Sequence, residues 1–461
     1  MSDQVYTRGM DSTKRLVLWI CILASFVPFL DGSVVNVALP AITHELGGGF
    51  VLQQWVVNAY AITLGAFMLV AGSFADLYGR QRIMKIGLVL FGVTSILCAA
   101  APTGVFLVAA RAAQGVAGAL LVPSSLALIM TYFKKAEVGK AIGSWTAWTG
   151  IAFIVGPLVG GLLVDFISWR MVFAINIVPI AINLYMLSRL DFAEKLQPRV
   201  KIDLAGAVLG IVGLGGVVYG LIEQSRLGWA DPVVYGALIV GLVALVGFVW
   251  HEHRAKQPML PLGLFRVRNF WVGNLASFAI YAGLALATFA ISIFIQQVGG
   301  YTAFEAGLAL LPVTVIMFFL SSRFGALASR LGPRVFMAAG PLVAGVGFAT
   351  MYFVSSSVSY WQILPGILLF GLGLSITVAP LTTAILGSIG EGQSGIASAV
   401  NNAVTRIAGL IAVAAIGSLV GQSLGLHGFR AITLVMTGLM ILGGIISALG
   451  IVNHVTTKDN L

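Results

Sequence analysis

Long apolar segments, separated by short polar ones, run through almost the whole of this chain. Between Leu16 and Leu39, Asp31 is the only charged residue. A helix rises about 1.5 Å per residue, so a segment of this length spans the hydrocarbon core of a bilayer. The same pattern recurs and predicts fourteen membrane-spanning helices in an all-α integral membrane protein. The predicted spans are 16–39, 55–74, 83–101, 105–130, 141–164, 169–187, 204–222, 232–250, 270–295, 303–320, 335–354, 361–384, 396–420 and 429–452.

The composition excludes a water-soluble protein. Hydrophobic residues make up 59% of the 461 residues and charged residues only 9%, whereas a soluble domain has about a quarter of its residues charged. Glycine occurs 56 times, which suits helices whose backbones approach closely in a membrane. The two cysteines, Cys21 and Cys98, lie in apolar spans, so we expect reduced packing residues rather than a disulfide or a metal pair.

The basic residues predict how the chain is oriented. With the amino terminus inside, 21 of the 26 Lys and Arg residues lie in cytoplasmic segments, and only Arg170, Arg226 and Arg430 lie outside. An even number of spans places both termini in the cytoplasm. The net charge of +10 therefore indicates a membrane surface, not nucleic acid, as the partner of the basic residues.

A weak internal repeat indicates two similar halves. Residues 72–79 (GSFADLYG) align with residues 325–332 (GALASRLG). We predict three parts: an N-terminal six-helix bundle over 1–190, an inserted two-helix linker over 191–269, and a C-terminal six-helix bundle over 270–461. Two similar bundles around a midplane cavity are the architecture of a transporter that works by alternating access.

Asp31 is the strongest candidate for chemistry. A carboxylate inside hydrocarbon costs about 2.5 to 3.5 kcal/mol even on insertion scales, so such residues usually have a function. We interpret Asp31 as a residue that takes up and releases a proton. The alternative is a buried structural acceptor of hydrogen bonds from a neighbouring helix, although a neutral Asn would serve that purpose at lower cost.

Six segments of the chain contain recognisable motifs. They are 30–40 in the first span, 72–82 in the following loop, 111–118 in the fourth span, 150–161 in the fifth, 169–176 after it, and 401–406 in the thirteenth. Together and in this order they resemble motifs of the major facilitator superfamily, and in particular of its fourteen-span drug:proton antiporters of the EmrB/QacA type. The resemblance covers nearly the whole chain.

The resemblance implies a major facilitator fold with two additional central helices, and a proton-coupled exporter of amphipathic, cationic organic compounds in a prokaryotic plasma membrane. We expect small organic molecules, protons and lipid as partners, and a monomer. Two alternatives remain open: a proton-coupled symporter that imports an organic solute, and a membrane scaffold or sensor that transports nothing. A phosphate loop, a nucleophile elbow and a metal-ligand cluster are absent from the sequence, so we expect neither an enzyme nor a cofactor.

The loop after the second span predicts a gate. Asp76 stands at the cytoplasmic end of that span, Gly79 permits a tight turn, and Arg80 follows one turn after Asp76. Such a charge pair could close the inward gate. The alternative is an ordinary positive-inside loop with a capping Asp. The second half has Ser329 at the position of Asp76, so a gate of this kind is asymmetric.

Arg111 is the predicted partner in proton coupling. Asp31 and Arg111 each lie about eight residues from the outer end of their span, which is roughly 12 Å deep, so they can meet if their helices are neighbours. An adjacent arginine would favour the ionised aspartate, and its removal would favour protonation. Arg111 could instead snorkel or bind backbone carbonyls. Arg406, in the thirteenth span, is given the same role.

The fifth span contains Gly156, Pro157 and Gly160, which give it a face of small residues and a kink. We predict a conformational role, as a hinge or seal between the halves.

Substrate contacts are predicted from aromatic and amide residues within the spans. Aromatic rings can stack on flat or cationic compounds, although most aromatic residues in spans serve as interface anchors or packing. Trp145, Trp148 and Tyr281 are the favoured aromatic residues. The full set is Asn36, Trp55, Asn58, Tyr60, Gln114, Trp145, Trp148, Tyr281 and Phe289.

Overall fold

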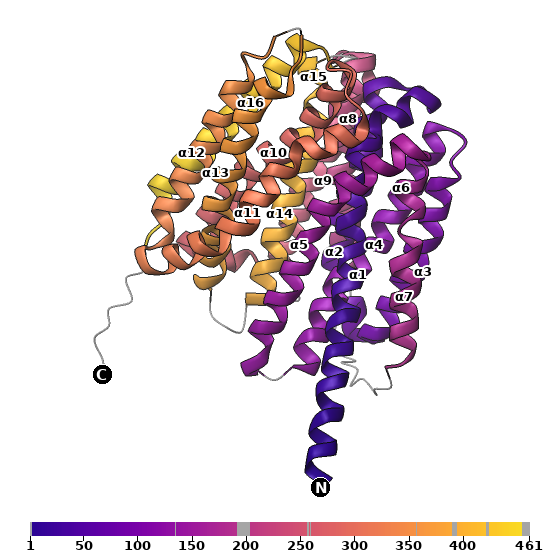
Figure 1. The fold of residues 1–461 in the computed structure, drawn as a ribbon, viewed down its shortest axis with the longest axis vertical. Coiled ribbons are helices and arrows are strands. Elements are labelled where there is room, and N and C mark those ends of the chain that lie inside the picture. Colours follow the sequence, from indigo (N-terminus) through magenta and orange to yellow (C-terminus); the bar gives the residue numbers. More distant parts are fainter. Residues whose placement is uncertain are drawn as a thin grey trace. The chain divides into compact units, whose positions relative to one another are not determined.

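A computed structural model of the chain shows helices joined by short connections (Figure 1). It describes residues 2–133, 135–190, 203–255, 258, 260–355, 357–389, 394–420 and 424–453, and contains no strand within those ranges. The elements are α1 (Ser2–Leu46), α2 (Gly49–Tyr78), α3 (Arg80–Ala99), α4 (Gly104–Tyr132), α5 (Lys135–Phe166), α6 (Met171–Ala174), α7 (Ile177–Ser188), α8 (Leu204–Leu227), α9 (Pro232–Arg254), η1 (Leu262–Arg266), α10 (Arg268–Gln297), α11 (Ala303–Leu331), α12 (Pro333–Met351), α13 (Tyr360–Gly387), α14 (Ser394–Ala415), α15 (Gly417–Val420) and α16 (Leu426–Gly450).

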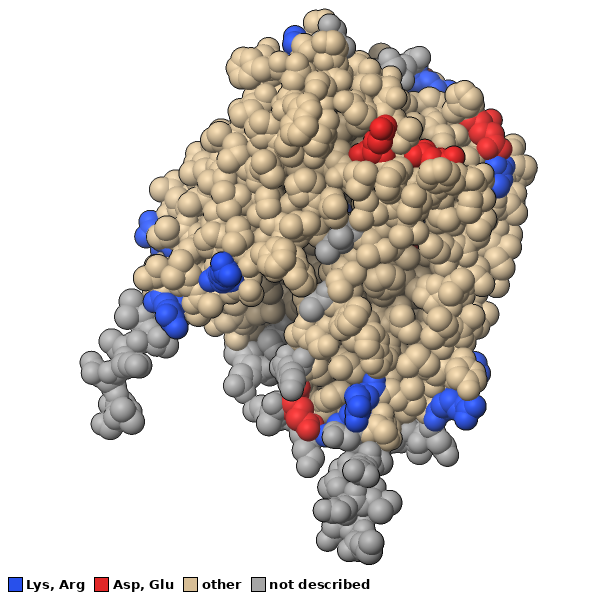
Figure 2. All heavy atoms as spheres, viewed as in Figure 1, with Lys and Arg blue, Asp and Glu red and all other residues tan. Residues whose placement is uncertain are grey.

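The prediction of fourteen spans is confirmed for the described part of the chain. Fourteen helical segments there are long and apolar enough to cross a membrane, and each overlaps a predicted span. Uncharged residues cover most of the face drawn in Figure 2, and charged side chains gather toward its ends. Such a surface suits a multi-pass membrane protein. The predicted cytoplasmic position of the termini stays a prediction.

By Cα packing, the chain divides into two compact units. Unit 1 consists of residues 1–215 with 302–304, and unit 2 consists of residues 216–301 with 305–461. The boundary falls within α8, so the first half of α8 is grouped with unit 1, whereas its second half and α9 are grouped with unit 2. The three-part division proposed above, with its linker at 191–269, remains a prediction.

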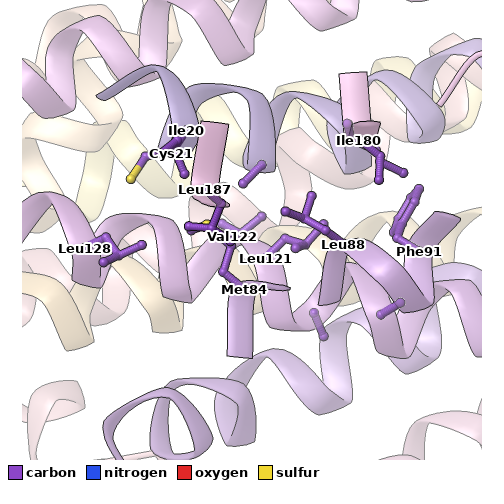
Figure 3. Close-up of a cluster of buried hydrophobic side chains, with 14 of the residues drawn as sticks. Ile20, Cys21, Met84, Leu88, Phe91, Leu121, Val122, Leu128, Ile180 and Leu187 are labelled. Carbon is purple, nitrogen blue, oxygen red and sulfur yellow. The ribbon is translucent and has the colours of Figure 1, made fainter. Parts of the chain in front are cut away.

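Unit 1 is built around α1 and α4. The most extensive helix pairs are α2 with α4, α1 with α5, and α3 with α4. Figure 3 shows part of the apolar core of this unit, a cluster of buried side chains that includes Cys21, Leu88, Leu121 and Ile180. Both cysteines are buried free thiols.

Unit 2 repeats some of this pairing. Its spans include α10 against α14 and α12 against α13, which are the counterparts of α1 against α5 and α3 against α4. The turns between second and third spans also correspond: Gly79 has φ of 97° and Gly332 has φ of 86°. Only glycine adopts such angles without strain, which explains why the aligned motifs both end in this residue.

The sixth predicted span is broken in the middle. The segment divides into α6 and α7 around Ile175 and Asn176. Pro179 has no N–H to donate to the carbonyl of Ile175, four residues earlier, and that carbonyl accepts instead from the N–H of Val178 at 3.3 Å. The break therefore has a sequence cause, and it places Asn176 at a point where the backbone is not part of a regular helix.

Candidate functional site

Asp31 lies at the centre of a buried polar cluster in unit 1. Its side chain is 0% exposed, and the side chain of Arg111 is 1% exposed. An Nη1–H of Arg111 donates to Asp31 Oδ2, so the two residues form an ion pair. A buried ion pair is stable only when further hydrogen bonds satisfy the remaining polar atoms, which makes the surroundings of this pair informative.

Two amides complete the shell around the carboxylate. Gln114 Nε2 donates to Asp31 Oδ1 at 3.0 Å, and Asn176 Nδ2 donates to the same oxygen at 2.9 Å. The three donors come from α4 and from the break between α6 and α7, while Asp31 belongs to α1. The site therefore joins three parts of the chain that are far apart in sequence.

Arg111 has several contacts in addition to its ion pair with Asp31. Its Nε donates to the carbonyl of Val56 at 3.1 Å, and its guanidinium lies 4.2 Å from the ring centroid of Tyr60 and 5.6 Å from that of Phe173. A cation over an aromatic face is stabilised by the ring quadrupole, more so when it is desolvated. The Tyr60 hydroxyl donates to the carbonyl of Pro28 at 3.2 Å. Arg111 thus has contacts with α2 in addition to its ion pair with Asp31.

An outer layer of polar groups supports Gln114. Its Oε1 accepts from Arg111 Nη1 at 2.6 Å and from Cys98 Sγ at 3.5 Å, and its Nε2 also donates to Ser95 Oγ at 2.9 Å. Asn176 Nδ2 lies 3.4 Å from the same Ser95 oxygen. Ser95, Cys98 and Asn176 were not predicted as site residues. The available signal was the presence of Ser and Asn inside apolar spans.

The fifth span packs directly beside the site. Gly156 and Gly160 face α1, and a Cβ added at Gly156 would overlap Ser33 Oγ, while one at Gly160 would lie 2.6 Å from Val34 Cγ2. Ser33 also donates to the carbonyl of Ala152 at 3.0 Å. These glycines let α5 approach α1 within unit 1. Pro157 lies between them, and the predicted role of all three in gating stays a prediction.

We expect Gly156→Ala to lower the thermal unfolding temperature of the detergent-solubilised protein. The added methyl group requires α1 and α5 to separate close to Asp31, and overpacking of this kind costs about 1 to 3 kcal/mol. Gly150→Ala is the matched control, because nothing lies within 4 Å of a Cβ at that position of the same helix. Equal unfolding temperatures for the two variants would contradict the assigned packing.

The predicted gate is described only in part. Arg80, at the start of α3, donates through Nη1 to the carbonyl of Ala127 at 3.1 Å and to Thr131 Oγ1, both near the end of α4. A cation there interacts favourably with the carbonyl end of a helix. The side chain of Asp76 lies outside the described residues, so the Asp76–Arg80 pair stays a prediction.

A second charged contact joins the carboxyl-terminal end of α1 to the segment before α6. Trp169 Nε1 donates to Glu45 Oε2 and Arg170 Nη1 donates to Glu45 Oε1, each at 2.6 Å. Arg170 Nη2 also donates to the carbonyl of Ala101 at 3.3 Å. This contact fixes the segment that leads to Asn176, seven residues after Trp169.

The predicted substrate residues of unit 1 fall into three groups. Tyr60 and Gln114 belong to the cluster around Asp31. Asn58 is fully buried, and neither atom of its amide has a hydrogen-bond partner, which is unusual for a buried amide. The remaining residues line helix faces or pack: Asn36 and Trp55 are half-buried, and Trp145 packs against the core cluster of Figure 3.

Trp148 forms the most exposed aromatic contact of this set. It is 43% exposed and lies on α5 with its ring centroid 5.0 Å from that of Trp19 on α1, which is 40% exposed. Trp19 was not predicted. A pair of exposed indole rings offers a flat, polarisable surface to an aromatic compound.

The predicted residues of unit 2 are not part of the Asp31 cluster. Phe289 is buried in α10, and Tyr281 packs against an apolar cluster of unit 2 that includes Phe270, Met337 and Leu381. Arg406 is half-buried in α14. Their predicted roles in substrate binding and proton coupling stay predictions. Among the described residues, no group of three or more His, Cys, Asp or Glu side chains could hold a metal ion.

Comparison with known proteins places the chain among transporters. Residues 21–413 match the family model described as Major Facilitator Superfamily. The chain is 36% identical over 415 residues to the multidrug resistance protein Stp of Mycobacterium tuberculosis, covering 89% of this chain and 76% of that protein. It is 33% identical to the methylenomycin A resistance protein of Bacillus subtilis, with 89% of each covered. It is 34% identical to the puromycin resistance protein pur8 of Streptomyces alboniger, covering 88% of this chain and 82% of that protein.

Solved structures share the fold at low sequence identity. A peptide transporter of the POT family in complex with sulfate superimposes with a TM-score of 0.71 at 15% identity, over 94% of this chain and 93% of that one. A D-xylose–proton symporter superimposes with a TM-score of 0.68 at 14% identity, over 95% of this chain and 98% of that one. At such identities the likeness concerns the fold alone.

Proposed function

Because this chain belongs to the major facilitator superfamily, we propose that it exports amphipathic organic compounds from the cell in exchange for protons, and that Asp31 is the residue that carries the proton. Relatives at 33 to 36% identity bear names of multidrug, methylenomycin A and puromycin resistance proteins, which favours export of drug-like compounds.

The single observation that supports proton coupling is the shell around Asp31. The carboxylate is fully buried in unit 1 and accepts hydrogen bonds from Arg111, Gln114 and Asn176. A purely structural residue at this depth would be cheaper as a neutral amide, because an ionised group pays a large desolvation cost. The ionised carboxylate is therefore best explained as one of two protonation states that Asp31 adopts in turn.

The ion pair gives these two states different structural consequences. With Asp31 ionised, the charges of α1 and α4 attract each other across a site of low dielectric, where Coulomb energies are large. Protonation neutralises the carboxylate and removes this attraction, while Arg111 keeps its contacts with Val56 and Tyr60. Unit 1 can then adopt a second packing of α1 against α4. Binding of a proton and binding of substrate are coupled if each favours one of these packings.

The proposed cycle follows from this coupling. Asp31 is protonated from the outside, which favours release of substrate there; it is deprotonated toward the cytoplasm, which favours binding of the next molecule. One elementary charge moving across the membrane is worth about 2.3 kcal/mol per 100 mV, so even a single proton supports accumulation against a gradient. Asn58 and the Trp19–Trp148 pair are the residues of unit 1 that we assign to the substrate: the amide offers hydrogen bonds, and the rings offer stacking.

Everted membrane vesicles provide the test. An inward-acid proton gradient is imposed and followed with a pH-sensitive dye, and an organic cation is then added on the outside, which corresponds to the cytoplasm. We expect the cation to accelerate the loss of the gradient and to accumulate inside the vesicles, because export into the lumen is coupled to exit of protons.

Vesicles from cells that lack the protein are the control. A panel of toxic cations, uncharged antibiotics and lipophilic acids, tested in the same way, identifies the charge class of the substrate. Loss of vesicle-loaded compound together with protons, in the same direction, would instead identify a symporter and contradict the proposal.

A further inference from the structure

Asn176 differs from the other two donors to Asp31 in how it is held. Arg111 is fixed by the carbonyl of Val56 and the ring of Tyr60. Gln114 is fixed by Arg111 and Cys98, which both donate to its Oε1 and so require the oxygen to point toward them. Asn176 has no such constraint, because its Oδ1 is buried and has no hydrogen-bond partner.

The geometry shows what a turned-over amide would meet. Asn176 Nδ2 lies 2.9 Å from Asp31 Oδ1 and 3.4 Å from Ser95 Oγ. A rotation of the amide by half a turn would place Oδ1 at the position of Nδ2. An oxygen there would repel an ionised carboxylate, but it would accept the hydrogen of a protonated one, and it could also accept from the Ser95 hydroxyl.

We propose that Asn176 is the movable partner of Asp31: its amide donates to the ionised carboxylate and turns over to accept the hydrogen of the protonated acid. This inference rests on the proposed proton-carrying role of Asp31. Gln114 cannot do the same, because a turned amide would direct its NH2 group at the guanidinium of Arg111. Asn176 is thus a positioning residue that gives Asp31 a hydrogen-bond partner in both states.

The local backbone suits such a residue. Asn176 lies where α6 ends and α7 begins, and its own N–H bonds at 3.3 Å to the carbonyl of Phe173, three residues earlier. The contact of Trp169 and Arg170 with Glu45 holds the preceding segment to α1, so the side chain stays within reach of Asp31 when its amide turns. The titratable or charged groups around the site are Asp31, Tyr60, Cys98 and Arg111, and each comes from a different helix.

Isotope-edited infrared difference spectroscopy tests the proposal on the unmodified full-length protein. Samples carry asparagine labelled with ¹³C at the side-chain carbonyl, and spectra are recorded as the pH is lowered in lipid vesicles. The carboxylic acid band of Asp31 is assigned by its loss in Asp31→Asn. We expect the labelled amide band of Asn176, assigned by its loss in Asn176→Leu, to shift together with the acid band, because its carbonyl acquires a donor.

The pH at which the acid band appears supplies a second readout. Asn176→Leu removes a donor from the charged form and an acceptor from the neutral form, and hydrogen bonds to charged groups are the stronger ones. We therefore expect the midpoint of Asp31 protonation, the pH at which the acid band reaches half of its full height, to rise by about one pH unit, since loss of a hydrogen bond to the charged form favours protonation. Asn176→Asp places a second acid beside Asp31 and is expected to raise the midpoint further.

Asn183→Leu is the matched control. Asn183 lies two turns further along α7, is equally buried, has an unpartnered Oδ1, and donates from Nδ2 to the carbonyl of Ile20 at 3.0 Å, away from Asp31. Loss of the Asn183 amide should leave the midpoint of Asp31 protonation unchanged.

Any of three results would overturn the inference. They are an amide band that does not change when Asp31 is protonated, an unchanged midpoint of Asp31 protonation in Asn176→Leu, and an equal shift of that midpoint in Asn183→Leu. Absence of an Asp31 acid band at any pH in the wild type would overturn the proposed function itself, so the two failures are distinguishable.

Discussion

Asp31→Asn is expected to abolish the proton movement that follows addition of an organic cation to everted vesicles, while the protein still inserts into the membrane. The amide has the shape of the carboxylate and fits the same fully buried position, but it cannot exchange a proton. Arg111 keeps the carbonyl of Val56, the Gln114 oxygen and the face of Tyr60 but loses its counter-charge, so we also expect a lower unfolding temperature. The measurement is the dye signal at equal amounts of protein in the vesicles.

Asp231→Asn is the matched control for this change. Asp231 is the N-cap of α9 and accepts from the N–H of Val233 at 2.8 Å, a role that Asn fills equally well. We expect its vesicles to respond as wild type does. A wild-type response in Asp31→Asn would remove Asp31 from the coupling mechanism and return it to the structural interpretation.

Much of the fold was predictable because a membrane imposes simple rules. Every backbone group in the hydrocarbon core must find its partner within the same segment, so an apolar run of sufficient length is a helix. The fourteen spans follow from that rule. Even the broken sixth span carries its cause in the sequence, because Pro179 withholds a donor from Ile175.

The site was only partly predictable, for a physical reason. The depth of a residue in the membrane can be estimated by counting residues from the end of its span, and this estimate places Asp31 and Arg111 at the same depth. Which way a side chain faces, and which helices are neighbours, depends on packing between distant segments. Asn176, 145 residues after Asp31, is therefore not among the predicted site residues, and the bonds of Gln114 to Asp31 and Arg111 are not evident from the sequence.

Arg111→Gln is expected to lower the stability of the protein strongly. Removal of the guanidinium leaves the Asp31 carboxylate buried without a counter-charge, and breaking a buried ion pair in this way costs about 3 to 5 kcal/mol. Asp31 can escape this cost by remaining protonated, which fixes the site in one state and stops transport. We expect a lower unfolding temperature in detergent and no response of the dye in vesicles.

The double variant Asp31→Asn with Arg111→Gln separates these effects. Two neutral amides can hydrogen-bond to each other and to Gln114, so the double variant should unfold at a higher temperature than Arg111→Gln alone while still transporting nothing. The difference from the sum of the single changes measures the interaction between the two residues, which for groups in contact is about 0.5 to 3 kcal/mol. If the single effects simply added, the two residues would not act as a pair, and the ion pair could not be the element that protonation switches.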